Sequence, residues 1–156
     1  MKLVISLLMS AVVGSINAQH CTDDTRFTDA EFFTDNEITI LRNEIYGTGI
    51  DARTGAEDTL RFDFFAPSSS ADTLSRRPFV LLMHGLGSTR DQMAGDCEAF
   101  AHRGFACATI DYRNAPPFPN PNLGTYLGNL DANAAMRYMV NRADTLGIDT
   151  AWLFAG

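Results

Sequence analysis

The sequence predicts an α/β fold in which a mostly parallel sheet follows an antiparallel N-terminal hairpin. Three short, continuous apolar runs predict strands that are buried on both faces, as parallel strands usually are. They read FVLLM, FACATI and AWLFA, and they begin at Phe79, Phe105 and Ala151. The stretches between them carry apolar residues at helical spacing. Strands that alternate with helices through short links require right-handed crossovers and a parallel sheet.

The first 18 residues are predicted to be a signal peptide. Lys2 precedes an apolar run from Leu3 to Gly14, and the small residue Ala18 stands where cleavage is expected. The run is shorter than the roughly 20 apolar residues that span a bilayer, so no stable membrane anchor is expected. We therefore expect a secreted or periplasmic protein whose domain occupies residues 19–156.

The charge balance of the chain disfavours several classes of partner. Lys2 is the only lysine, so the processed chain carries 11 arginines against 19 acidic residues, a formal charge of −8. An acidic surface without a basic stripe argues against nucleic acid and against anionic membranes. The sequence has no CxxC motif, and His20, His84 and His102 are scattered, so no metal site is predicted.

The N-terminal hairpin is predicted from two segments with alternating apolar residues. Residues 37–46, EITILRNEIY, are rich in β-branched side chains, and residues 59–65, TLRFDFF, alternate apolar with charged side chains. Residues 47–55 between them are turn-like, which predicts an antiparallel pair of strands. Residues 66–77 contain proline and several serines and are predicted to form a loop.

Two helices are predicted between the buried strands. The first covers Thr89–Arg103 and ends before Gly104, and the second covers Thr125–Leu146 and ends before Gly147. Residues 115–121 are too rich in proline for regular structure. Because loops at the carboxyl ends of strands often carry function, we expect this one to line a substrate cleft.

The three cysteines are an odd number, which leaves one thiol without a partner among residues 1–156. Cys97 lies on the buried stripe of the first helix, and Cys107 lies on the strand that follows it, so a bond between them is one alternative. We predict instead that both are buried thiols that act as small hydrophobic side chains. Cys21 would then pair with a residue beyond Gly156.

The first buried strand runs directly into His84-Gly85-Leu86-Gly87, and three kinds of site use such a corner. A Walker-type phosphate loop needs lysine followed by serine or threonine after the last glycine, whereas Ser88-Thr89-Arg90 follows here. A dinucleotide site would use Asp111 to bind ribose. Such a site needs the motif G-x-G-x-x-G, and Arg90 stands at the position of the third glycine. The third possibility is an oxyanion hole, in which backbone N–H groups stabilise developing negative charge by several kcal/mol.

From Thr59 to Gly156 the chain resembles the α/β-hydrolase fold family, in particular its secreted carboxylesterase and lipase branch. The resemblance rests on LLMHGLGS, CEAFAHRGFACATIDYR and DANAAMRYMVNRADTLGIDTAWLFAG, in this order and at this spacing. It implies that the loop at Leu86 and Gly87 forms the oxyanion hole, with His84 and Gly85 supporting it. Many members have a run of glycines after the histidine, so the side chain of Leu86 would have to point away from the ester.

The same resemblance implies that residues 19–156 form the N-terminal part of the domain. In this family the strand that matches AWLFAG leads into the nucleophile elbow, G-x-S-x-G. The nucleophilic serine would then come just after Gly156, with the acid and the catalytic histidine further on, so that no catalytic residue lies within the chain and this portion is expected to be inactive by itself. We expect the intact protein to be a secreted serine hydrolase that cleaves a small-molecule carboxylic ester without a cofactor. A non-catalytic binding protein on the same fold, a serine peptidase and a dinucleotide-binding βαβ protein are the alternatives.

Three other polar residues have predicted structural roles. Asp111 is predicted to be a hydrogen-bonded aspartate at the end of a strand, paired with Arg113, because the family's catalytic acid follows the serine. His102, late in a helix, is predicted to lie on the surface. Asp131 is predicted to be stabilised by the dipole near the start of its helix.

Overall fold

Five strands form one sheet in the computed structural model, which describes residues 25–52, 54–113 and 121–156. The strands are β1 (Ile38–Ile50), β2 (Glu57–Pro67), β3 (Arg77–Met83), β4 (Ala106–Ile110) and β5 (Ile148–Ala155). Their order in the sheet is β1-β2-β4-β3-β5. The β1–β2 and β2–β4 pairs are antiparallel, whereas β4–β3 and β3–β5 are parallel. The predicted α/β fold with an antiparallel N-terminal hairpin is therefore confirmed.

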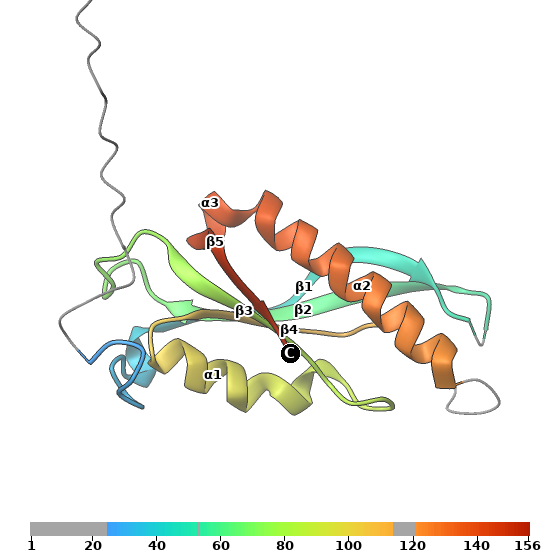
Figure 1. Cartoon of the computed structure of the whole chain (residues 1–156), viewed down its shortest axis with the longest axis horizontal. Helices are drawn as coiled ribbons and strands as arrows, with labels where there is room; N and C mark the ends of the chain where they lie inside the picture. The colour runs from blue at the N-terminus through green and yellow to red at the C-terminus, as the bar shows by residue number, and fades with distance from the viewer. Residues whose placement is uncertain (1–24, 53, 114–120) are drawn as a thin grey trace, which may run out of the picture.

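Helices cover both faces of this sheet (Figure 1). The helical elements of the described residues are the 3₁₀ turns η1 (Asp35–Glu37) and η2 (Arg90–Met93) and the α-helices α1 (Ala94–His102), α2 (Pro121–Asn141) and α3 (Ala143–Leu146). In Figure 1, α1 lies on one side of the sheet and α2 on the other. No helix in the described ranges is long and apolar enough to cross a membrane.

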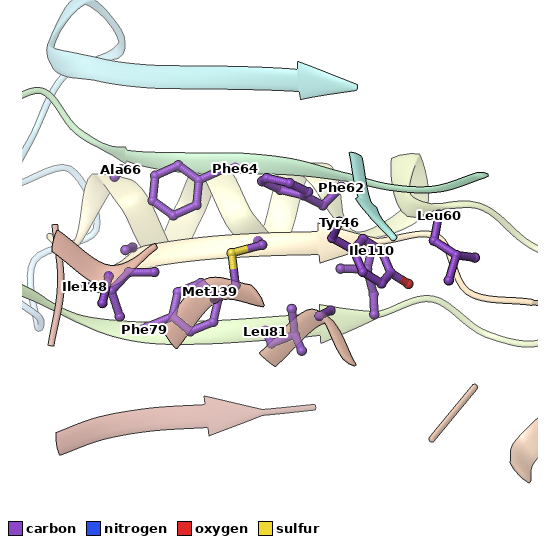
Figure 2. Packing of buried hydrophobic residues seen from close by; sticks show 14 residues of the cluster. Tyr46, Leu60, Phe62, Phe64, Ala66, Phe79, Leu81, Ile110, Met139 and Ile148 are labelled. Carbon is purple, nitrogen blue, oxygen red and sulfur yellow. The ribbon is translucent and has the colours of Figure 1, made fainter. Parts of the chain in front are cut away.

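Two separate hydrophobic cores result from this layering. The larger one lies between the sheet and α2, and Figure 2 shows Phe62, Phe79 and Met139 gathered in it. The smaller one lies under α1 and includes Phe65 and Val80. Successive residues of a strand point to opposite faces. Both sides of β3 are buried, which is why its sequence is a continuous apolar run.

The borders of several elements differ from the sequence-based predictions. β1 continues to Ile50 rather than turning at Gly47, because residues 47–50 still pair with β2 and Ile50 lies opposite Glu57. β3 begins at Arg77, whose backbone N–H donates to the Gly147 carbonyl over 2.9 Å.

The two helical segments are also divided differently. The first starts with η2 before α1, and the second starts at Pro121 and is interrupted at Arg142, which is the N-cap of α3. The predicted signal peptide with its cleavage after Ala18, Cys21 and residues 114–120 of the proline-rich loop lie outside the described residues.

The last strand, β5, forms one edge of the sheet in the described part of the chain. Its Trp152 and Phe154 side chains are 50% and 47% exposed. β5 nevertheless ends in close contact with β3, because the Met83 N–H donates to the Gly156 carbonyl over 2.8 Å and the Gly156 N–H donates to Leu81 over 3.0 Å. Gly156 is thereby held next to the residue that precedes His84.

A disulfide bond joins Cys97 of α1 to Cys107 of β4, so the prediction of two buried free thiols is wrong. The face of β4 that carries Cys107 is the face that α1 covers, and Cys97 lies on the buried side of α1. This brings the two Cα atoms to 5.1 Å, within the usual range for a disulfide. Both residues are fully buried.

Replacing both cysteines, Cys97→Ala with Cys107→Ala, is expected to lower the free energy of unfolding. Closing a loop of this size restricts the unfolded chain and contributes about 3 kcal/mol. Urea denaturation of the wild type and of the double variant measures the difference. A reductant should lower the midpoint of the wild type alone. Equal midpoints, or two reactive thiols from Cys97 and Cys107 in denatured, unreduced protein, would contradict the bond.

Candidate functional site

The glycine-containing corner forms an exposed turn after β3. The Ser88 N–H donates to the Gly85 carbonyl over 3.1 Å, which closes the turn. Gly87 has a φ of +83°, in the left-handed region where a side chain would be strained. Leu86 at the tip is 52% exposed, so its side chain projects into solvent rather than into the core. Residues 84–89 therefore present their backbone at the carboxyl end of a parallel strand.

His84 lies beneath this turn, almost fully buried at 4% exposure. Its Nδ1–H donates to the Gly85 carbonyl over 2.8 Å, and its ring stacks on Tyr112 with the centroids 4.3 Å apart. The Tyr112 hydroxyl donates to the His84 carbonyl over 2.8 Å. Tyr112 in turn lies against Gly128 of α2, where an added Cβ would come within 3.0 Å of the Tyr112 ring. The stack connects the turn to both β4 and α2.

The side chain of Gln92 closes the turn from the other side. Its Oε1 accepts the Gly85 N–H over 3.1 Å, and its own backbone N–H donates to the Thr89 carbonyl over 3.1 Å. No hydrogen-bond acceptor for the Leu86 N–H lies within the described ranges. Sequence reasoning did not identify Gln92, because no motif marks a glutamine seven residues after a glycine.

Arg90 fixes the far end of the turn to three strands. Its backbone N–H donates to Asp111 over 2.8 Å, and its guanidinium forms an ion pair with the same carboxylate. The guanidinium also donates to Asp63 on β2 over 3.0 Å and to the Asn43 side chain on β1 over 3.1 Å. The Thr109 hydroxyl on β4 donates to the Arg90 carbonyl over 2.9 Å. The turn therefore cannot move without breaking several charged contacts.

Asp63 is the buried anion of this network, at 2% exposure. Burial alone would raise the pKa of its carboxyl group, but hydrogen bonds from the Asn43 N–H, Arg42 and Arg90 together hold that pKa below its usual range. For Arg90, burial opposes the charge, but the hydrogen bonds and charges of Asp63 and Asp111 raise the pKa of the guanidinium. The lowered pKa of Asp63 and the raised pKa of Arg90 keep this ion pair charged at neutral pH.

The partners of Asp111 and Asp131 differ from those predicted. Asp111 pairs with Arg90 rather than with Arg113, because the turn after β3 brings Arg90 over the end of β4. Both Asp111 oxygens accept from Arg90, which disfavours a ribose-binding role. Arg113 instead binds Asp131, with Nη2 and Oδ1 2.6 Å apart. Asp131 lies in the middle of α2 rather than near its start, so the predicted stabilisation by the helix dipole is wrong, and the buried carboxylate is stabilised by this ion pair.

His102 is also more enclosed than predicted. Its Nδ1–H donates to the Phe33 carbonyl over 2.6 Å, and its side chain is 14% exposed. The segment before β1 covers it, which the sequence did not indicate. Neither His84 nor His102 is hydrogen-bonded to a serine in the described ranges. These ranges also hold no group of three or more metal-ligating side chains.

A cavity of about 240 Å³ lies beside the turn. It is lined by Met83, His84, Leu86, Tyr112, Gly124, Thr125, Gly128 and Asn129. The lining carries no Asp, Glu, Lys or Arg side chain. A cavity of this size can take a small, uncharged group of a ligand whose polar part lies against the backbone of the turn.

Several solved structures are similar to this chain. A bacterial heroin esterase is 25% identical with a TM-score of 0.55, and the match covers 83% of this chain and 37% of that protein. An esterase from the Planctomycetes species Thermogutta terrifontis is 23% identical with a TM-score of 0.55, over 73% of this chain and 38% of that one. Vibralactone cyclase is 15% identical with a TM-score of 0.56, over 80% of this chain and 34% of that one.

The chain spans less than half the length of these structures. No protein-family model and no curated protein sequence matches it.

The Asp63 network gives a prediction about stability and pH. Asp63→Asn should lower the free energy of unfolding at pH 7 by about 3 kcal/mol, because it leaves the buried side of Arg90 without its anion. Folding lowers the pKa of Asp63. The contribution of its charge to the free energy of unfolding is therefore complete above the unfolded-state pKa of about 4, and it is lost as the pH falls through the lower folded-state pKa.

The difference between wild type and variant should therefore be constant at neutral pH and shrink in acid. Urea denaturation across this pH range measures it, with Glu57→Gln, on an exposed residue of the same strand, as the control. A difference that stays the same down to strongly acidic pH would show that the Asp63 charge is not the source of the stability.

Proposed function

The chain has the α/β-hydrolase fold, and on this premise we propose that the intact protein is a serine hydrolase that cleaves a small-molecule carboxylic ester. The observation that carries the proposal is the exposed backbone turn at Leu86 and Gly87, fixed by Arg90 at the carboxyl end of β3. Two of the similar structures reported above are esterases.

The proposed chemistry uses the turn as an oxyanion hole. When a serine attacks the ester carbonyl, negative charge develops on its oxygen, and fixed N–H donors stabilise that charge by several kcal/mol. The proposed donors are the N–H groups of Leu86 and Gly87. The Leu86 side chain is half-exposed and also lines the adjoining cavity, which would take the acyl or alcohol group of the ester.

The proposed nucleophile is the serine of a G-x-S-x-G elbow just after Gly156, with a histidine as the base and an acid further along. The contacts between Gly156 and β3 support this placement. Because Gly156 is hydrogen-bonded to Met83, a residue that follows it would emerge beside the turn that starts at His84. No cofactor takes part in this mechanism.

A secreted or periplasmic location is proposed on two grounds. The first 18 residues have the composition of a signal peptide that is cleaved after Ala18. The Cys97–Cys107 disulfide is of a kind that persists in oxidising compartments and is rare in the cytosol.

The direct test uses the protein expressed from its intact gene. We expect it to hydrolyse p-nitrophenyl esters and to react with a fluorophosphonate, and peptide mapping should find the label on the serine after Gly156. Labelling of a different serine would refute the proposed nucleophile. Absence of both labelling and turnover in folded protein would favour a non-catalytic binding protein, and cleavage of peptides but not of esters would favour a peptidase.

Leu86→Pro tests the oxyanion donor in the same protein. Proline removes the N–H at this position, so kcat should fall by about 100- to 1000-fold if that group stabilises the oxyanion. Leu86→Ala keeps the N–H and is the matched control, with an expected change of no more than a few fold. Equal activities of the two variants would exclude the Leu86 N–H as a donor.

A further inference from the structure

We propose that Gln92 is a positioning residue that orients the turn at residues 84–89 for catalysis. The proposal rests on the function proposed above, because it assigns the turn's geometry to a specific side chain. Gln92 does not touch the ester in this proposal. It acts through the backbone of Gly85.

Besides the His84–Tyr112 stack beneath it, the turn is held at each end by a side chain of η2, and Gln92 supplies the attachment at the near end. At the far end, Arg90 is bound to Asp63 and Asp111. At the near end, the only side chain in the described ranges that accepts the Gly85 N–H is that of Gln92, at 3.1 Å. The residues between these two points include the proposed donors.

Gln92 is attached to a rigid base. It belongs to η2, whose first residue, Arg90, is bound through its carbonyl group to Thr109 on β4 and through its N–H to Asp111, which directly follows β4. The Gln92 backbone N–H is itself bound to the Thr89 carbonyl. A hydrogen bond from such a base can fix the direction of the Gly85 peptide group relative to the sheet.

The bond to Gln92 has two consequences for the turn. The peptide group between His84 and Gly85 is held on its carbonyl side by the Tyr112 hydroxyl, and the bond to Gln92 holds its N–H side, so that Gly85, which has no Cβ to restrict it, keeps one orientation. The bond also occupies the Gly85 N–H, so that this group cannot compete for the carbonyl oxygen of the ester. The next N–H in the chain, that of Leu86, has no acceptor in the described residues and is left for the oxyanion. Donors that are fixed in advance need no reorganisation during the reaction.

Gln92→Met tests the role of the side-chain carbonyl. Methionine has similar length but no good acceptor, so the turn should lose its near attachment while the exposed position tolerates the change. In the intact protein, kcat should fall about tenfold with KM within about twofold, because the lost interaction acts in the transition state. Gln92→Asn, whose amide is one methylene shorter, should give the same result. Asp91→Asn, on the exposed neighbour, is the control and should leave both constants unchanged.

A second measurement separates positioning from general stability. A boronic acid that forms a tetrahedral adduct with the serine should bind the Gln92→Met variant more weakly, by about the same factor as kcat/KM falls. Binding of the carboxylic acid product should stay the same. In NMR experiments the Gly85 amide proton should exchange about tenfold faster in the variant. Unchanged kcat and unchanged boronic acid affinity in an active enzyme would overturn the proposal.

The outcomes also distinguish this inference from the proposed function. If the wild-type protein has no esterase activity, the proposed function fails, and the role of Gln92 in positioning an oxyanion hole fails with it. The Gly85 exchange rate would then show whether the contact holds the turn at all. If the wild type is active and the Gln92 variants have the same kcat and the same boronic acid affinity, the proposed function stands and only the role of Gln92 is wrong.

Discussion

The buried charge of Asp63 is the constraint on which the arrangement of this molecule depends. A carboxylate so far from solvent must be neutralised by hydrogen bonds and opposite charges, and here Arg42, the Asn43 N–H and Arg90 do so. To satisfy this anion, β1 must present Asn43 and the turn after β3 must bring Arg90 over the sheet. One charge on β2 thereby couples the hairpin to the loop that follows the central parallel strand.

The two hydrophobic cores also fix the position of the turn after β3. Apolar side chains on both faces of β3 fix the level at which the strand ends, and the disulfide ties α1 to the neighbouring strand β4. The position of the turn is thus fixed both by the ion pairs of Arg90 and by the apolar packing of β3. The His84–Tyr112 stack joins the two, since it lies between the turn and α2.

Much of this fold could be predicted from the sequence, because burial and periodicity are local properties. The apolar runs FVLLM and FACATI indicate strands buried on both faces, and the helical stripes indicate helices with one buried face. The ion pairs could not be predicted, because Arg90 lies 27 residues from Asp63 and 21 from Asp111. Gln92 could not be identified either, because its contact with Gly85 exists only once the turn has folded back toward η2. The choice between thiols and a disulfide could not be made either, because the helical stripe places Cys97 against the sheet but does not give the 5.1 Å between its Cα atom and that of Cys107.

The half-exposed indole of Trp152 has a practical consequence for studying this protein. It is the only tryptophan in the sequence, and it lies on β5, at the edge of the described sheet. Within residues 1–156 the indole fluorescence therefore comes from a single known place, a few residues from Gly156. Any peptide segment, partner or ligand that covers this strand would exclude water from the ring and shift its emission to shorter wavelength. The molecule carries its own optical probe at the strand that leads toward the candidate site.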